Sequence, residues 1–375
     1  MNFLNRKTVE DIDVTGKRVL VRCDYNVPFD SEGNITDTKR IDESIKTLRY
    51  LIDHNAKVII CSHRGRPKGT VKPELSLAPT IPYLSKVLGQ QVQMATDVVG
   101  ESAKALCSNL QEGQVMMLEN VRFEKGEEAN DPAFAKELAS LADIYVNDAF
   151  GTSHRAHAST AGVAAYLPAV CGYLIQKELQ VLGNALNHPA RPFVAILGGA
   201  KVSDKIGVIT ALLDKIDVLI VGGGMAYTFT NALGYSIGNS LCEPDKLELA
   251  KDIMAKAKEK GVNFLIPVDN VIANKFAEDA QWQIVDSDQI PEGWMGLDIG
   301  PKSAEIFAHA IEHAGTVFWN GPLGVSEWKN FAEGTFKVAQ ALAHSDAYSI
   351  IGGGDSAAAV EKLGFAKQMS HISTG

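Results

Sequence analysis

The strongest constraint on the fold is one order of segments that recurs along the chain: a short β-branched run, a glycine-rich or polar turn, and a longer stretch with helical periodicity. In the first half the strand-like runs cover residues 19–24, 57–62, 114–120 and 144–148. Each run is nearly continuous and apolar, as parallel strands are when helices cover both faces of their sheet. The sequence therefore predicts an α/β fold built from parallel βαβ units.

The second half repeats this order, with apolar runs at 193–199, 217–224, 263–269, 316–321 and 348–354. A chain of 375 residues is too long for one ordinary hydrophobic core. We therefore predict two Rossmann-like domains, each with a parallel β-sheet flanked by helices.

Residues 173–188 have the spacing of one amphipathic helix and are followed by Pro189 and Pro192. We expect this segment to be an interdomain helix that joins the two domains through a hinge. The predicted boundaries are residues 1–172 for the N-terminal domain, 173–188 for the helix and 189–375 for the C-terminal domain.

Composition and charge argue against several classes of protein. The formal net charge of −9 opposes nucleic-acid binding, which needs a clustered positive face. No apolar stretch approaches the ~20 residues of a membrane helix, and the first residues lack the apolar core of a secretory signal. The five cysteines form neither a CxxC pair nor a zinc-type spacing. We therefore expect a cytoplasmic protein that binds neither nucleic acid nor membrane.

Three strands of the second half end in glycines that lead toward a helix, in LGGAKVSDK (197–205), VGGGMAYTF (221–229) and IIGGGDSAA (350–358). Such turns present backbone N–H groups and helix N-termini to an anion. One turn is weak evidence, because tight βα turns need glycine for steric reasons alone, but three in one half favour phosphate or nucleotide binding. Neither GxxxxGK[ST] nor a complete GxGxxG is present, which argues against a P-loop protein and a nicotinamide dehydrogenase.

Charged residues follow these turns. Lys201 and Lys205 are four residues apart, so we expect both on the opening turn of a helix, pointing the same way toward a polyphosphate; the alternative is a solvated lysine pair. Asp355 follows the third glycine run, where it fits either a helix cap or a carboxylate ligand of nucleotide-bound Mg²⁺. Glu327 lies in a polar loop, as a ribose ligand or a surface residue.

The turns of the first half carry basic residues instead, in DYN (24–26), HRGR (63–66), Arg122 and HRAH (154–157), and Arg40 joins them at a helix start. All four turns are expected at one edge of a parallel sheet. A small polyanion fits such a patch, because arginine forms bidentate bonds with phosphate and carboxylate groups.

Simpler interpretations exist for single members of this patch. A lone histidine is more often structural, and Arg64 or Arg155 fits a surface ion pair equally well. Asp24 and Asn26 are expected to orient substrate hydroxyls and arginine side chains rather than to act as bases.

The motifs, in chain order, are DYNVP, SHRGRP, LENVRF, NDAFGTSHRAH, LGGAKVSDK, VGGGMAYTF, WNGPLG, IIGGGDSAA and HISTG. They cover practically the whole chain, and the sequence resembles the phosphoglycerate kinase family. The resemblance implies an N-terminal domain for 3-phosphoglycerate or 1,3-bisphosphoglycerate and a C-terminal domain for ATP or ADP with Mg²⁺. It also implies domain closure, a monomer, and reversible phosphoryl transfer in glycolysis and gluconeogenesis.

The resemblance further assigns residues to two sites. The implied substrate-binding residues are Asp24, Tyr25, Asn26, Arg40, His63, Arg64, Gly65, Arg66, Arg122 and Arg155. The implied nucleotide-binding residues are Gly199, Lys201, Lys205, Asn320, Glu327, Gly353, Gly354, Asp355 and Ser356, with Asp355 on Mg²⁺. Arg40, Lys201 and the amides of Gly353 and Gly354 are expected to stabilise the phosphoryl group in transfer.

The chain departs from the family pattern in two places. The loop GVSE lacks the aromatic residue that the family often has before its glutamate, and the chain stops at STG where the family continues with further glycines and a tail. The second departure leaves one alternative open, a catalytically impaired module that binds nucleotide without turnover.

Overall fold

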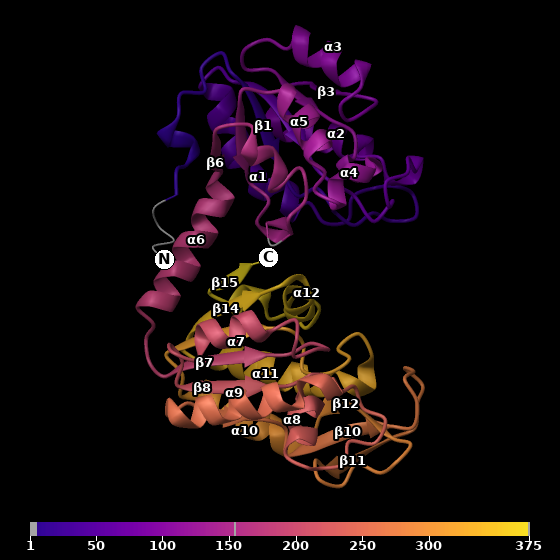
Figure 1. Ribbon diagram of the computed structural model, residues 1–375, viewed down its shortest axis with the longest axis vertical. Helices are drawn as coiled ribbons and strands as arrows, with labels where there is room; N and C mark the ends of the chain where they lie inside the picture. The colour runs from indigo at the N-terminus through magenta and orange to yellow at the C-terminus, as the bar shows by residue number, and fades with distance from the viewer. Residues whose placement is uncertain (1–5, 154, 374–375) are drawn as a thin grey trace. The chain divides into compact units, whose positions relative to one another are not determined.

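The computed structural model describes residues 6–153 and 155–373 (Figure 1). Contacts between residues divide the chain into two compact units, with the division between Gly183 and Asn184. Helix α6 (Tyr173–Asn187) contains this division and forms where the amphipathic spacing predicts a helix.

The first unit contains a six-stranded parallel sheet in the order β3-β4-β2-β1-β5-β6. Its strands are β1 (Arg18–Arg22), β2 (Lys57–Cys61), β3 (Val92–Met94), β4 (Val115–Met117), β5 (Ile144–Asn147) and β6 (Ala169–Cys171). All four predicted apolar runs form strands. The two edge strands, β3 and β6, are three residues long, too short for the sequence pattern to show.

Helices cover both faces of this sheet. They are η1 (Val9–Asp11), α1 (Lys39–Asp53), η2 (Pro73–Leu75), η3 (Ala78–Thr80), α2 (Ile81–Leu88), α3 (Glu101–Asn109), η4 (Val121–Phe123), α4 (Lys125–Glu128), α5 (Pro132–Ser140), η5 (Phe150–Thr152) and η6 (Gly162–Ala165). Val19 and Val21 of β1 enter one hydrophobic core and Leu20 enters the other. This alternation explains why the parallel strands are apolar at nearly every position.

The second unit contains another six-stranded parallel sheet, in the order β15-β14-β13-β7-β8-β9. Its strands are β7 (Phe193–Leu197), β8 (Val218–Val221), β9 (Asn263–Leu265), β13 (Thr316–Asn320), β14 (Tyr348–Gly352) and β15 (His371–Ser373). Two parallel sheets flanked by helices are the predicted α/β fold.

Helices again lie on both faces. They are α7 (Ile206–Leu212), α8 (Ala226–Ala232), η7 (Pro244–Lys246), α9 (Leu247–Glu259), α10 (Pro301–Glu312), η8 (Lys329–Phe331), α11 (Glu333–His344), α12 (Gly354–Lys362) and η9 (Ala366–Gln368). Apolar residues of α7, α8 and α9 share a core with one face of β7, and those of α10, α11 and α12 share a core with the other. No helix among the described residues is long and apolar enough to cross a membrane.

A second, antiparallel sheet in this unit was not predicted. It consists of β10 (Asp269–Ala273), β11 (Trp282–Asp286) and β12 (Met295–Ile299), in the order β11-β10-β12. The prediction of one strand over 263–269 is therefore wrong: the run divides between β9 and β10. Pro267 lies in the break, where it has no N–H to donate to a sheet.

Candidate active site

In the first unit, the loops that follow β4, β2, β1 and β5 are neighbours in that order. The strands are parallel, so their carboxyl ends meet at one edge of the sheet. The residues concerned include Asp24 after β1, His63 after β2, Arg122 after β4 and Arg155 after β5. The sheet thus assembles at one edge the basic turns that the sequence analysis singled out.

His63 lies at the centre of these loops and is buried. Its pKa is held well below the ordinary value of histidine, first by burial and then by the positive charges of Arg22, Arg122, Arg40 and Arg155. Four arginines from separate segments therefore lie close enough to act on one imidazole. The ring is neutral at neutral pH, so one of its nitrogens donates and the other accepts.

Arg40, in the first turn of α1, is held by the loop after β1. Its Nη1 atom donates to Asp24 Oδ2 at 3.0 Å and to the Asn26 carbonyl oxygen at 3.2 Å. The buried Asp24 carboxylate also lies 3.9 Å from Nδ1 of His63. Asp24 thus positions Arg40 and partly offsets the positive charge of the cluster.

Hydrogen bonds also tie the loops to one another. The Gly65 N–H donates to Asn26 Oδ1 at 2.8 Å, and Arg122 Nη1 donates to the Gly65 carbonyl oxygen at 2.8 Å. The Nε atom of Arg122 is buried, has no hydrogen-bond partner among the described residues and lies 3.7 Å from a carboxylate oxygen of Glu128. Arg122 is therefore fixed in place, and within the described part of the chain one of its donors is unused.

Other implied substrate residues have different surroundings. Arg64 stacks on Phe29 at 3.7 Å and donates to the Ser76 carbonyl oxygen at 2.7 Å. The Tyr25 hydroxyl is buried against Ser44 Oγ at 2.8 Å, and burial raises its pKa well above the ordinary value. These two side chains have internal partners, whereas Arg155 is partly exposed and Arg66 is exposed.

Sequence reasoning missed Arg22, the last residue of β1, which is completely buried. Its Nε donates to Ser159 Oγ at 2.8 Å, and Ser159 Oγ donates to a carboxylate oxygen of the buried Glu127 at 2.6 Å. Arg22 Nη2 lies 3.3 Å from His63 Nδ1. The available signal was a charged residue inside the apolar run VLVRCD, because a charge in a buried strand requires partners.

In the second unit, the loops after β14, β13, β7 and β8 are likewise neighbours at one edge. Their backbones interlock: the Gly198 N–H donates to the Asn320 carbonyl oxygen at 2.9 Å, and that of Gly223 to Leu323 at 3.1 Å. A Cβ atom on Gly198 would lie 2.1 Å from the Pro322 carbonyl oxygen. Close backbone packing therefore already explains the glycine at 198.

Gly353 and Gly354 have different surroundings. Gly353 has a φ of +91° and precedes α12, and Gly354 is the exposed first residue of that helix. No atom of residues 6–153 or 155–373 lies within 4 Å of the position that a Cβ on Gly354 would take. The space beside Gly354 at the start of α12 is therefore open, whereas a Cβ on Gly353 would lie 3.0 Å from Asn320 Nδ2.

Lys205 joins three of these loops. Its Nζ atom donates to Asn320 Oδ1, and Asn320 Nδ2 donates to the Gly352 carbonyl oxygen at 2.8 Å. Burial lowers the pKa of Lys205, while the charges of Asp204 and Asp355 act in the opposite direction. Lys205 is therefore in electrostatic reach of Asp355.

The expected helical placement of Lys201 and Lys205 is wrong. Helix α7 begins only at Ile206, and the preceding residues form a turn that leaves Lys201 exposed. The physical reason is a distant contact: the N–H and hydroxyl of Ser203 both donate to the carboxylate of Glu243, at 3.1 and 2.5 Å.

The remaining implied nucleotide residues are a loop glycine, a buried serine and two exposed carboxylates. Gly199 has a φ of +109° and lies in the loop after β7. Ser356 is buried, and its Oγ accepts the Gly321 N–H at 2.6 Å, so it supports the loop after β13. Glu327 and Asp355 are exposed carboxylates, in the loop before η8 and in the first turn of α12.

The surroundings of Asp355 fit a magnesium ion carried by nucleotide phosphates, which needs one or two protein carboxylates and keeps water ligands. Asp355 is exposed and directly follows Gly354 in the first turn of α12. Among the described residues, the one cluster of three metal-ligand side chains is elsewhere, at the end of α10: His309, Glu312 and the following His313. Phosphate oxygens and water would therefore have to supply the rest of the coordination at Asp355.

Comparison with known proteins decides the family. The family model described as "Phosphoglycerate kinase" matches residues 9–375. The chain belongs to the phosphoglycerate kinase family.

Relatives and solved structures agree with this assignment. A phosphoglycerate kinase of Clostridium botulinum strain Hall is 60% identical over 378 residues, which cover 100% of this chain and 94% of that protein. One from Clostridium kluyveri is 59% identical, over 99% of this chain and 94% of that protein. The phosphoglycerate kinase structure from Coxiella burnetii has a TM-score of 0.80 at 44% identity, covering 98% of this chain and 93% of that one. The structure from Pyrococcus horikoshii has 0.77 at 31%, with the same coverage.

Family membership gives the reaction class. The chain is a phosphotransferase with a carboxyl group as acceptor, a phosphoglycerate kinase that transfers a phosphoryl group reversibly between an acyl phosphate and a nucleotide. This excludes the dehydrogenase alternative. The full-length relatives also give no support to an impaired nucleotide-binding module.

Proposed function

We propose that the first unit binds 3-phosphoglycerate or 1,3-bisphosphoglycerate and that the second binds ATP or ADP with Mg²⁺. The domains we assign are residues 1–172 and 189–375, joined by the helix at 173–188. The observation that carries the proposal is the convergence of four arginines around the neutral His63 at the strand ends of the first sheet. A small, multiply charged anion complements that arrangement.

On the acid side, we assign charge recognition to Arg40, Arg122 and Arg155. The carboxylate of Asp24 fixes Arg40, and Asn26 links its own loop to Gly65. The remaining residues of the proposed substrate-binding set are Tyr25, His63, Arg64 and Arg66. Neutral His63 adds a hydrogen-bond donor without adding further positive charge.

On the nucleotide side, the amides of Gly353 and Gly354 at the start of α12 are the proposed phosphate cradle, and the space beside Gly354 is open. The other proposed nucleotide ligands are Gly199, Lys201, Lys205, Asn320, Glu327, Asp355 and Ser356, with Glu327 toward the ribose. Asp355 would hold Mg²⁺, which neutralises charge on the phosphate oxygens when bound.

The chemistry needs little from the protein besides position and charge. A carboxylate oxygen of 3-phosphoglycerate attacks the terminal phosphorus of ATP; the new O–P bond forms as the bond to the ADP oxygen breaks. Because the carboxylate is already ionised at neutral pH, no general base is required. We assign stabilisation of the transferring phosphoryl group to Arg40, Lys201 and the amides of Gly353 and Gly354.

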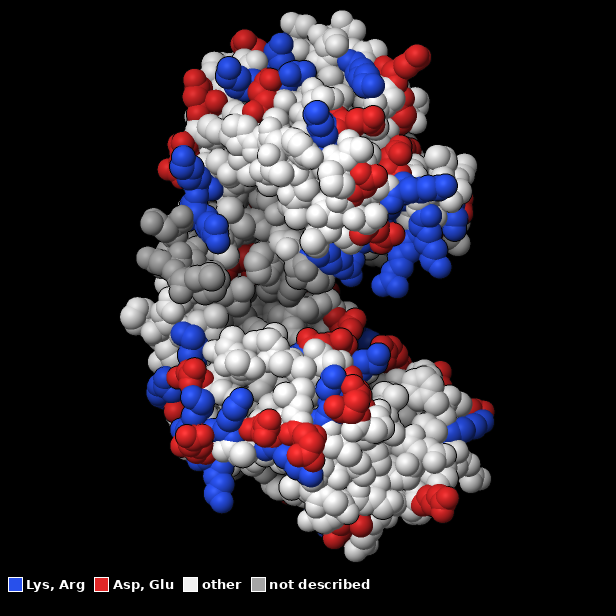
Figure 2. Space-filling view, viewed as in Figure 1, with Lys and Arg blue, Asp and Glu red and all other residues white. Residues whose placement is uncertain are grey.

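We also propose that the protein acts as a cytoplasmic monomer without a nucleic-acid or membrane partner. All five cysteines are free thiols, as is usual in a reducing compartment. On the face shown in Figure 2, acidic and basic side chains are mixed over both units, which differs from the basic face of nucleic-acid-binding proteins.

A coupled assay of ATP-dependent 3-phosphoglycerate phosphorylation tests this proposal on the chain as it stands, first with magnesium and then with a chelator. The expected result is turnover that stops when magnesium is removed. Full activity in the chelator would remove the metal from the proposal. Binding of ADP and magnesium without turnover would contradict the proposed activity and favour the catalytically impaired module instead.

A further inference from the structure

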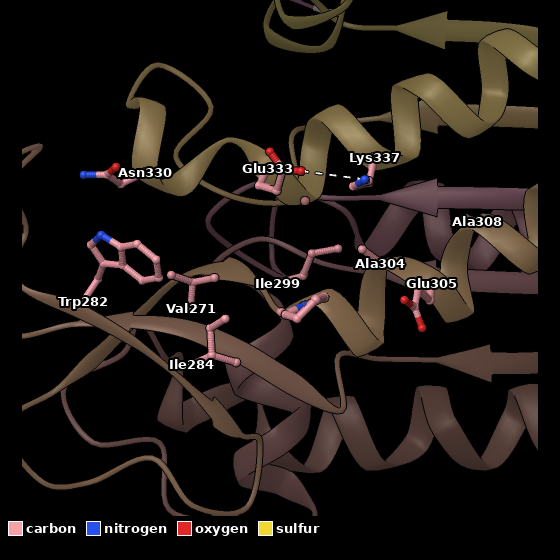
Figure 3. A pocket seen from close by; sticks show the side chains of 13 residues that line it. Val271, Trp282, Ile284, Ile299, Ala304, Glu305, Ala308, Asn330, Glu333 and Lys337 are labelled. Atoms are coloured by element: carbon pink, nitrogen blue, oxygen red, sulfur yellow. Dashed lines mark ion pairs between the residues drawn. The ribbon is translucent and has the colours of Figure 1, made fainter.

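A cavity of about 380 Å³ lies in the second unit between the three-stranded sheet and the first turns of α10 and α11 (Figure 3). Its apolar floor includes Val271 of β10, Ile299 of β12 and Ala304 of α10, all buried. None of the lining residues belongs to the proposed substrate or nucleotide set. The volume is within the range of small-molecule sites, about 300–1,000 Å³.

One wall of the cavity is unusually apolar for an exposed surface. Trp282 and Ile284 of β11 are 48% and 50% exposed. They are two residues apart, so they project from the same face of the sheet, paired across the strands with Ala273 and Val271. An exposed indole beside an aliphatic side chain offers a flat partner surface to a planar ring.

The rim of the cavity carries more negative than positive charge. Glu305 of α10 is exposed on one side, and Glu333 and Lys337 of α11 lie across the opening, 3.9 Å apart at their charged atoms (Figure 3). Lys337 offsets one carboxylate, which leaves a net charge of −1 from these three residues.

The N-termini of α10 and α11 do not make the cavity favourable for an anion. At the start of α10, the N–H groups of Lys302 and Ser303 donate to the buried carboxylate of Asp269, at 3.0 and 2.8 Å. At the start of α11, the N–H of Gly334 donates to the buried Asp298 at 2.8 Å. Because these N–H groups already donate to carboxylates, they are not available as hydrogen-bond donors to an anion in the cavity.

We propose that this cavity binds a flat organic cation, an aromatic ring system that carries a protonated amine. The ring lies against Trp282, Ile284 and Val271, and the ammonium group faces Glu305 and Glu333. The volume sets the size of the ligand at about one or two fused rings.

The test uses the intact chain and 2-naphthylmethylamine, which is protonated at pH 7, as the probe. Binding is followed by NMR through the indole N–H signal of Trp282, assigned by its loss in Trp282→Phe. We expect a saturable shift of this signal, and we expect 2-naphthoate, of similar shape but opposite charge, to bind more weakly. No saturable shift up to millimolar probe, or equal affinity for the two probes, would overturn the proposal.

Variants that remove charge from the rim of the cavity provide a second test. The double variant Glu305→Gln/Glu333→Gln should weaken binding of the amine by roughly 3–10-fold, since each exposed ion pair contributes a modest amount. Glu312→Gln is the matched control, because Glu312 is an exposed glutamate of α10 outside the cavity lining. All three glutamates are exposed, so these variants should fold. Equal weakening by Glu312→Gln, or none by the double variant, would refute the placement of the ammonium group.

Discussion

At the scale of single residues, Arg40 is the side chain with the most specific expected role. Replacing Arg40 with alanine should lower kcat by roughly 10³–10⁵, the range seen for arginines that stabilise a transferring phosphoryl group. The coupled assay measures the loss, and the affinity for ADP should be unchanged because Arg40 lies in the first unit. Arg49→Ala, an exposed arginine of the same helix, is the control. Near-normal turnover of Arg40→Ala would remove this residue from the mechanism.

A substitution at Gly354 tests whether glycine is needed there for nucleotide binding rather than for packing. Within the described part of the chain nothing lies within 4 Å of a Cβ at this position, so Gly354→Ala should leave the free energy of unfolding unchanged or raise it by up to about 1 kcal/mol. The same methyl group would occupy the approach to the α12 amides, and the Kd for ADP should rise about tenfold or more, equivalent to about 1.4 kcal/mol.

Gly207→Ala is the matched control for this substitution, since Gly207 is a helical glycine with the same open surroundings. It should change neither the Kd for ADP nor the fold. Isothermal titration of both variants compares the two positions, and an unaltered Kd in Gly354→Ala would argue against phosphate binding at α12.

The lowered pKa of His63 predicts how the stability of the first unit depends on pH. Its folded-state pKa lies well below the ordinary value near 6.5, so as pH falls below 6.5 the unfolded chain takes up a proton that the folded chain does not. Stability of the first unit should therefore fall with decreasing pH, by up to about 1.4 kcal/mol at pH 5.5 from this residue. Urea unfolding at pH 7.5 and 5.5 should show a smaller difference in His63→Gln. The exposed His54→Gln should behave like the parent chain.

At the scale of elements, buried carboxylates fix where helices begin. Asp269 accepts from the N–H groups of Lys302 and Ser303 and from the Ser303 hydroxyl, the last at 2.6 Å. Asp269→Ala should lower the free energy of unfolding by about 2 kcal/mol, because buried donors at the start of α10 lose their acceptor. Thermal unfolding measures this, with the exposed Asp288→Ala as control. Equal melting temperatures would show that α10 does not depend on this cap.

Some helices, strands and loops could be predicted from the sequence, and others could not. The parallel strands were predictable because burial on both faces makes their runs apolar. Strand β11 was not, since its first three residues are exposed and no apolar run marks it. Topology predicted which loops meet, whereas the turn at Lys201 depends on a contact between Ser203 and Glu243, forty residues apart. The placement of Arg22 likewise depends on Ser159 and Glu127, which no local pattern relates to β1.

At the scale of the whole molecule, the proposal gives each substrate to a different unit. Transfer then requires the two bound substrates to meet, so we expect the radius of gyration to decrease when 3-phosphoglycerate and a non-hydrolysable ATP analogue are bound together. Small-angle scattering measures this change, and each ligand alone serves as the comparison. Identical dimensions with one ligand and with both would contradict closure as a step of the cycle.

The interlocked loops of the second unit have a consequence for evolution. At Gly198 and Gly223, main chain meets main chain, so a side chain at either position would push the loops after β7, β8 and β13 apart. We expect substitutions to accumulate elsewhere in the unit without moving the phosphate-facing amides. Gly198 and Gly223 themselves should tolerate no replacement. We therefore expect relatives to keep these two glycines and the backbone around them while neighbouring side chains vary.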